Sequence, residues 1–154
     1  MSERSVEHAT FVVQRSYEAS PERAFAAWAD KEAKARWFVD SEAQLELDFR
    51  IGGRERNRGT APDGSAYTYE AIYQDIVPAR RIVYTYEMLL DGIRISVSLA
   101  TAEFNPERDG TRLIFTEQGA FLDGHEAPAL REHGMGSLLD SLGQWLQISQ
   151  SDGG

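Results

Sequence analysis

The chain contains no cysteine among its 154 residues. Disulfide bonds, thiolate catalysis and zinc sites built on cysteine are therefore excluded. Basic residues are also scarce, because 16 Lys and Arg stand against 25 Asp and Glu and leave a formal net charge of −9. Phosphate contacts need clustered Lys and Arg, so neither a nucleic acid nor an anionic membrane is an expected partner.

Long apolar runs are missing as well. No stretch approaches the roughly 18 consecutive apolar residues of a membrane-spanning helix, and Met1–Ala9 lacks the apolar core of a signal peptide. We therefore expect a cytoplasmic protein. Apolar residues still make up 42% of the chain, which is enough for one domain, residues 1–154, with a substantial buried core.

Motifs for metal and nucleophilic chemistry are absent from the sequence. The three histidines, His8, His125 and His133, do not have the close paired spacing of zinc ligands. No G-x-S-x-G motif surrounds a serine, and no glycine-rich phosphate loop joins a strand to a helix. We therefore expect no metal site and no cofactor.

What the chain does contain is a definite order of secondary-structure patterns. Alternating apolar residues predict a first strand over residues 11–17. Ser20-Pro21 and Asp30 are start signals for two short helices. Alternating segments separated by turns occupy residues 45–119, and one of them, Arg54–Thr60, is polar enough to predict an edge strand.

The C-terminal segment predicts one long amphipathic helix that begins at Pro128. Its apolar stripe consists of Met135, Leu138, Leu139, Leu142, Trp145 and Leu146. Gly134, Gly136 and Gly143 interrupt this helix, each at a cost of about 1 kcal/mol relative to alanine. They either allow close packing against a sheet or leave room for a ligand. The order predicts an α+β scaffold in which an antiparallel sheet of six or seven strands curls round this helix.

The turn Asp91-Gly92, between two alternating runs, is the strongest hairpin signal in the sequence. A two-residue turn there pairs Met88 with Ile95 and Tyr86 with Val97, so that one face of the hairpin is entirely apolar or aromatic. We take this face as the inward one.

A carboxylate is expected on the same inward face. Matching the apolar residues of the strand at 111–119 to the inward set places Glu117 beside Val97. A carboxylate in an apolar pocket can have a raised pKa and exchange protons with a bound carbonyl compound, while tyrosine hydroxyls steady an oxyanion. Glu117 is therefore the one catalytic candidate. The alternatives are that it faces solvent or pairs with Arg15 or Arg112.

The order and spacing of several short motifs resemble one known family. In chain order the motifs are Arg15–Pro21, Phe25–Trp28, Arg36–Phe38, Leu47–Gly53, Pro62–Gly64, Val77–Tyr84, Thr111–Gly119 and Leu138–Leu142. The domains they resemble are homologous to the activator of the 90-kDa heat-shock-protein ATPase and belong to the START-like, or SRPBCC, superfamily. The resemblance covers nearly the whole chain and implies a helix-grip fold, in agreement with the order of patterns above.

The same resemblance implies little about function. The superfamily includes lipid carriers, hormone receptors, aromatase/cyclases, ring-hydroxylase subunits and chaperone activators. Two departures from the family pattern fall where a cavity entrance is expected: Gly134-Met135 replaces Gly-Trp, and Trp37–Asp40 lacks the Gly-Pro that often follows the Trp. The eukaryotic activators grip the chaperone with a separate N-terminal domain that this sequence does not contain, so a chaperone partner is disfavoured.

Binding of a small apolar or aromatic molecule between the sheet and the C-terminal helix is the function that the sequence favours. The expected lining is Trp37, Tyr69, Tyr84, Tyr86, Met88, Val97, Glu117, Phe121, Met135 and Leu139. One alternative is a cyclase- or hydratase-type enzyme with Glu117 as acid/base. Another is a protein-interaction module with a filled core and an exposed apolar patch. A symmetric homodimer is compatible with the sequence, but no pattern specifies it.

Overall fold

The computed structural model describes residues 4–152, so both ends of the predicted 1–154 domain lie outside the described residues. In chain order the strands and α-helices are β1 (Val6–Tyr17), α1 (Pro21–Ala29), α2 (Lys31–Phe38), β2 (Leu45–Leu47), β3 (Arg54–Thr60), β4 (Ala66–Val77), β5 (Arg81–Leu90), β6 (Ile93–Glu107), β7 (Gly110–Leu122) and α3 (Pro128–Asp152). A 3-10 helix, Glu42–Gln44, precedes β2. The two short helices after the first strand and the long C-terminal helix are as predicted.

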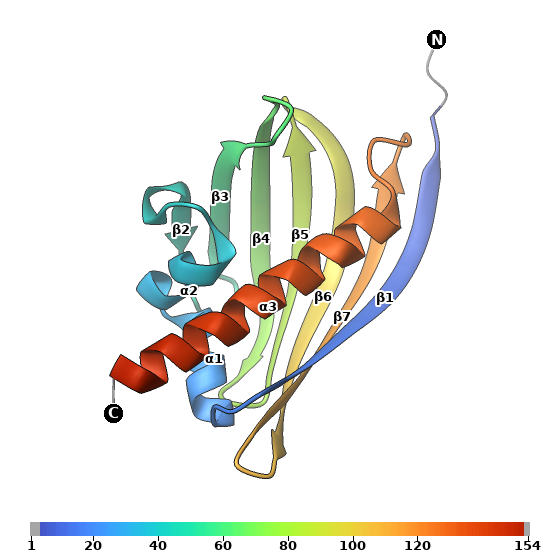
Figure 1. Ribbon diagram of the computed structural model, residues 1–154. Helices are drawn as coiled ribbons and strands as arrows, with labels where there is room; N and C mark the ends of the chain where they lie inside the picture. The colour runs from blue at the N-terminus through green and yellow to red at the C-terminus, as the bar shows by residue number, and fades with distance from the viewer. Residues whose placement is uncertain (1–3, 153–154) are drawn as a thin grey trace.

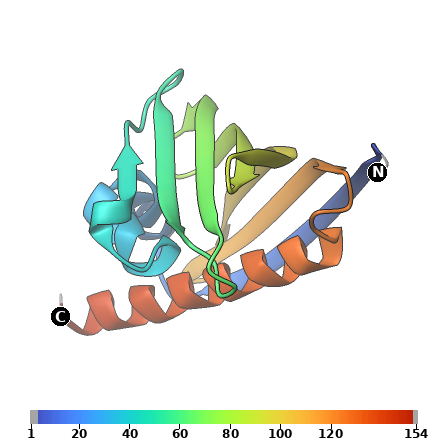
Figure 2. The ribbon, with the colours of Figure 1, turned by 90° about the horizontal axis from the view of Figure 1, so that it is seen from above.

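The strands form one antiparallel sheet in the order β1-β7-β6-β5-β4-β3-β2. Helix α3 crosses one face of this sheet, and α1 and α2 lie beside its C-terminal half (Figure 1). Seen from above, the sheet bends round α3 (Figure 2). The α+β helix-grip prediction is therefore confirmed. No helix among the described residues is long and apolar enough to cross a membrane.

Both short helices begin at the residues that their sequence signals predict. The side chain of Ser20 accepts a hydrogen bond from the backbone N–H of Arg23 at 3.1 Å. The carboxylate of Asp30 accepts one from the N–H of Ala33 at 3.1 Å. Each cap satisfies a backbone donor that the helix itself leaves free, and a cap of this kind typically stabilises a helix by about 1 kcal/mol.

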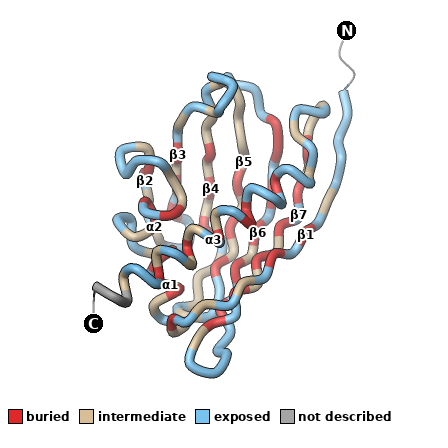
Figure 3. Tube along the Cα trace, in the orientation of Figure 1, coloured by how far each residue is buried: buried red, intermediate tan, exposed pale blue. Residues whose placement is uncertain are grey.

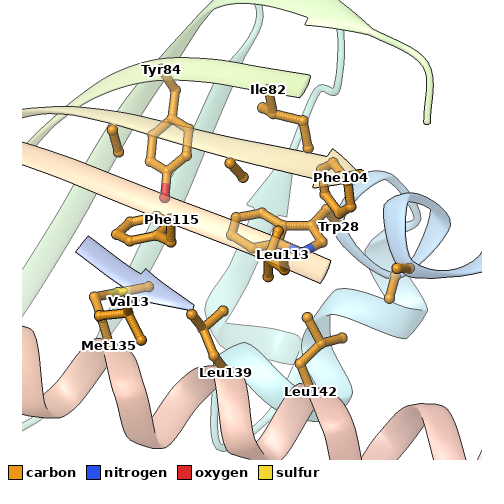
Figure 4. Close-up of a cluster of buried hydrophobic side chains, with 14 of the residues drawn as sticks. Val13, Trp28, Ile82, Tyr84, Phe104, Leu113, Phe115, Met135, Leu139 and Leu142 are labelled. Carbon is orange, nitrogen blue, oxygen red and sulfur yellow. The ribbon is translucent and has the colours of Figure 1, made fainter. Parts of the chain in front are cut away.

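The core lies between the concave face of the sheet and the three helices. Trp28 is completely buried, and its ring centroid lies 5.0 Å from that of Trp37 and 6.4 Å from that of Phe115. From the other side, Leu139 and Leu142 of α3 point toward the sheet (Figure 4). This cluster anchors α1, α2 and the middle of α3 to one surface.

Two of the three glycines in α3 serve close packing. A Cβ at Gly143 would lie 3.0 Å from Cε1 of Tyr17, and one at Gly136 would lie 3.0 Å from Nη2 of Arg15. Tyr17 and Arg15 both belong to β1, so this edge strand passes directly beneath the helix. The close-packing interpretation therefore holds for these two positions.

The predicted register of the β5–β6 hairpin is wrong beyond its first residues. The ladder skips Ile95, because Leu89 pairs with Arg94 whereas Met88 pairs with Ser96. Ile95 is thus the extra residue of a β-bulge, which reverses the facing of every later position of β6.

Val97 consequently faces away from the core, and its exposed fraction is 44%. The prediction that Val97 lines an inner cavity is wrong for this reason. Ser96 and Ser98 occupy the inward positions instead and are buried. Buried and exposed positions alternate along the strands (Figure 3), so a shift of one residue exchanges the two faces.

Glu117 faces inward as predicted, although its predicted neighbour is wrong. It pairs with Ala100 rather than with Val97. The β5–β6 and β6–β7 registers each differ from the prediction by an odd number of residues. Each such difference exchanges the two faces of a strand, so the two together leave Glu117 on the predicted face. The side chain of Glu117 is fully buried.

The polar segment Arg54–Thr60 is an inner strand, which corrects the edge-strand prediction. It pairs with both β2 and β4, and the edges of the sheet are β1 and β2. Its alternation directs Glu55 and Asn57 inward, where both are buried. The polarity of this strand therefore marks buried polar contacts.

Candidate functional site

A pocket of about 530 Å³ lies between the sheet and the N-terminal half of α3. Its walls come from the end of α2 and the loop after it, from β3 to β5, from the segment before α3, and from α3 itself. The lining residues are Phe38, Val39, Asp40, Asn57, Pro62, Tyr67, Tyr69, Tyr84, Tyr86, Met88, Glu126, Leu130, Arg131, Gly134, Met135 and Leu138.

Half of the predicted lining residues contact this pocket. They are Tyr69, Tyr84, Tyr86, Met88 and Met135. In the close-up, Tyr84 points from the sheet toward α3, and Met135 points from α3 toward the sheet (Figure 4). These five side chains therefore face the space between the sheet and α3.

The other predicted residues lie elsewhere. Trp37 and Leu139 belong to the packed core. Phe121 is buried, with the guanidinium of Arg131 5.2 Å from its ring centroid. Glu117 is fully buried behind Tyr86 and does not line the pocket, and Val97 lies on the outer face.

Both departures from the family pattern fall on the pocket wall. Phe38, Val39 and Asp40, which follow Trp37 where the family often has Gly-Pro, line it, as do Gly134 and Met135. A Cβ placed on Gly134 would have no neighbouring atom within 4 Å. Gly134 therefore leaves space open beside the pocket, unlike the two tightly packed glycines of the same helix.

Aromatic rings form one wall of the pocket. The ring centroid of Tyr69 lies 4.7 Å from that of Tyr86 and 5.4 Å from that of Phe38. Burial raises the pKa of Tyr69, Tyr84 and Tyr86 well above the usual tyrosine value. These hydroxyls stay neutral at physiological pH, so each is able to donate as well as accept a hydrogen bond.

Glu117 is the centre of a buried polar network behind this wall. Its Oε2 atom accepts hydrogen bonds from the hydroxyls of Tyr86 at 2.7 Å and Ser98 at 2.8 Å. Nη1 of Arg131 lies 3.4 Å from the same oxygen. Burial raises the pKa of Glu117, and the contacts with Tyr86, Arg131 and Ser98 partly oppose that shift.

Arg131 connects the network to the pocket. On the sheet side it donates to the hydroxyls of Tyr86 and Ser96, each at 2.8 Å. Its Nε and Nη2 atoms also donate to the carboxylate of Glu126, another residue of the pocket lining, at 2.9 and 2.6 Å. With Glu117 on Nη1, every N–H of the guanidinium has a partner.

Sequence reasoning missed both Arg131 and Glu126, although one signal was present. Arg131 lies one helical turn before Met135 and therefore on the apolar stripe of α3. A charged residue on a buried stripe needs a buried partner. Glu117 pairs with Arg131 rather than with Arg15 or Arg112.

A second buried ion pair supports the α2 side of the pocket. Nζ of Lys34 lies 2.6 Å from Oε1 of Glu55, and both side chains are almost completely buried. The Tyr73 hydroxyl donates to the same carboxylate. Lys34 also lies 4.4 Å from the ring centroid of Phe38, which lines the pocket. Among residues 4–152, no three His, Asp or Glu side chains converge in a way that could hold a metal ion.

Comparison with known proteins agrees with the fold. The sequence model of a family described as Activator of Hsp90 ATPase homolog 1-like protein matches residues 18–147. An uncharacterised protein from Rhizobium leguminosarum is 44% identical, and its structure matches 96% of this chain and 99% of its own with a TM-score of 0.91. Protein Mll3558 from Rhizobium loti is 45% identical over 92% of this chain and 99% of its own, with a TM-score of 0.87.

A more distant structure shares the fold alone. Protein CV1439 from Chromobacterium violaceum is 24% identical, over 89% of this chain and 96% of its own, with a TM-score of 0.74. No curated protein matches the chain. The matches confirm the family resemblance drawn from the sequence motifs.

Proposed function

We propose that this chain, which belongs to the family of Activator of Hsp90 ATPase homolog 1-like proteins, binds a small, largely apolar ligand between the sheet and α3. The observation that carries the proposal is the pocket of about 530 Å³ at that place. Sites for small molecules typically have volumes of roughly 300–1,000 Å³ and apolar walls with a few polar groups.

The composition of the walls supports an apolar ligand with an aromatic or flexible body. Phe38, Tyr69 and Tyr86 present aromatic surface, and such rings stack on flat apolar groups. Met88 lines the pocket from the sheet, and Met135 lines it from the helix. Methionine side chains adapt their shape to irregular partners, which suits a binding surface.

Two buried polar atoms of the pocket lining are available to orient the ligand. Neither Oδ1 of Asn57 nor the hydroxyl of Tyr69 has a hydrogen-bond partner among the described residues. An unsatisfied buried acceptor costs about 1–3 kcal/mol. A ligand hydroxyl or N–H placed against Asn57 would remove that cost, so the ligand is expected to carry a donor at this end.

The enzymatic alternative, with Glu117 as acid/base, has less support. Tyr86 and Arg131 stand between Glu117 and the pocket, and the carboxylate is fully buried. A general acid or base must reach the reacting proton directly or through one water. Glu117 is better suited to positioning Tyr86 and Arg131. A protein-interaction module with a filled core is also less favoured, because space remains between sheet and helix.

Native mass spectrometry of the purified protein, with extraction of any bound molecule, tests the proposal. A co-purifying apolar compound is expected for the wild type. Gly134→Leu should lose this compound, because the leucine side chain enters the open space beside the pocket. Ser137→Leu places a leucine on the exposed face of α3 instead and should retain the compound. Equal retention by both variants, or no ligand together with no binding of apolar probes, would refute the proposal.

A further inference from the structure

We infer that the ligand carries a carboxylate, and that Glu126 occupies the carboxylate position on Arg131 until the ligand replaces it. This inference rests on the proposed function, since it assigns the chemical class of ligand for the same pocket. It concerns the one cationic side chain among the described residues that line the pocket.

The contact between Arg131 and Glu126 has the geometry of ligand recognition. Two N–H groups along one edge of the guanidinium, on Nε and Nη2, meet the two oxygens of one carboxylate at 2.9 and 2.6 Å. This two-point arrangement is the one by which arginine recognises a planar carboxylate in ligands. Both residues of this pair belong to the pocket lining.

The rest of the guanidinium is held from the opposite side. Tyr86, Ser96 and Glu117 contact Nη1 and Nη2 from the sheet, and all three are buried. These contacts keep the Nε and Nη2 edge of Arg131 in place whether or not Glu126 is bound. The arginine is therefore preorganised for a carboxylate, which either Glu126 or a ligand can supply.

Glu126 is the partner that is able to leave. Its side chain is 21% exposed, whereas those of Arg131 and Glu117 are 7% and 0% exposed. It lies in the segment between β7 and α3, where Asp123 and Gly124 have positive φ angles of 56° and 69°. Release of Glu126 into solvent would leave the buried ion pair of Arg131 with Glu117 intact.

The occupied N–H groups of Arg131 favour an anionic ligand over a neutral one. All five N–H groups of Arg131 are engaged, so a neutral ligand finds no free donor there. A ligand carboxylate that takes the place of Glu126 keeps one carboxylate on the Nε and Nη2 edge. Its apolar body would then lie along the wall that includes Tyr69, Met88 and Met135.

The test compares 2-naphthoate with 2-naphthylmethanol, which differ in the carboxylate, by titration calorimetry at low salt. In the wild type the carboxylate compound should bind more tightly. Glu126→Gln removes the internal competitor and should tighten naphthoate binding by about tenfold, the equivalent of one charge-assisted contact. Binding of the alcohol should change little. Glu132→Gln, an equal change of charge on the exposed face of α3, is the matched control and should alter neither.

Arg131→Lys separates recognition from simple attraction. Lysine keeps the positive charge opposite Glu117 but cannot offer two parallel N–H groups. We expect this variant to fold and to lose most of the preference for naphthoate over the alcohol. Circular dichroism checks its folding, and Glu126→Gln supplies an independent result should it unfold.

The outcomes distinguish this inference from the proposed function. Equal binding of the two compounds, unchanged by Glu126→Gln and abolished by Gly134→Leu, would overturn the carboxylate assignment and leave the pocket as a binding site. Failure of both compounds to bind any variant would overturn both statements. The inference is supported if Glu126→Gln binds naphthoate more tightly than the wild type does and Glu132→Gln binds it as the wild type does.

Discussion

Replacing Gly134 by alanine should stabilise the protein, even though the residue lies next to the proposed binding site. Glycine in the middle of a helix is less favourable than alanine by roughly 0.5–1 kcal/mol. The added Cβ at Gly134 meets no atom within 4 Å, so no steric cost opposes this gain. We expect the free energy of unfolding to rise by about 0.5–1 kcal/mol, which corresponds to about 1–4 °C in Tm for a domain of this size.

Gly143→Ala provides the matched comparison within the same helix. Its Cβ would lie 3.0 and 3.3 Å from two ring carbons of Tyr17. That ring cannot move freely, because the Tyr17 hydroxyl donates to the carbonyl of Leu139 at 2.8 Å. Overpacking of this kind typically costs about 1–3 kcal/mol and should cancel or exceed the gain in helix propensity.

Urea denaturation followed by far-UV circular dichroism measures both variants under identical conditions. The unfolding midpoint should rise for Gly134→Ala and should stay equal or fall for Gly143→Ala. A fall for Gly134→Ala, or the same shift in both variants, would refute the reasoning about open space beside Gly134. If Gly134→Ala also weakens ligand capture, the glycine keeps the pocket open at the expense of stability.

Three further predictions follow from the buried charges and the strand register. Lys34→Met leaves the carboxylate of Glu55 buried without its cation and should lower the free energy of unfolding by about 3–5 kcal/mol; a loss below about 1 kcal/mol in urea denaturation would contradict the ion pair. Burial raises the pKa of Glu117, so the folded protein binds the proton more tightly than the unfolded chain does. The free energy of unfolding of the wild type, relative to that of Glu117→Gln, should therefore fall as pH rises from 4.5, the ordinary pKa of a glutamate, through the raised pKa of Glu117 in the folded protein. A difference in free energy between the two proteins that does not change with pH would argue against this burial. Val97→Ser should change the free energy of unfolding by no more than about 0.5 kcal/mol, because Val97 faces outward; a larger loss would favour the inward register.

Local patterns in the sequence determined the kind and order of the elements. Ser20 and Asp30 cap their helices through backbone groups only three residues away. The turn at Asp91-Gly92 and the helix start at Pro128 likewise depend on residues that are neighbours in the chain. Such signals are legible without any knowledge of tertiary contacts, and together with the strand alternation they were sufficient for the helix-grip fold.

The tertiary structure alone decided which face of β6 is buried and which charges meet. Side chains in a strand alternate with a period of two, so one unforeseen residue, Ile95, exchanged the positions of Val97 and Ser98. The partnership of Glu117 with Arg131 joins residues of β7 and α3 whose proximity depends on how the helix crosses the curved sheet. Alternation in the sequence shows which residues of a strand share a face, but it does not show which face is buried. A buried charge needs a partner that only the folded structure brings close. The elements of this protein were therefore predictable, but most of the polar half of its candidate site was not.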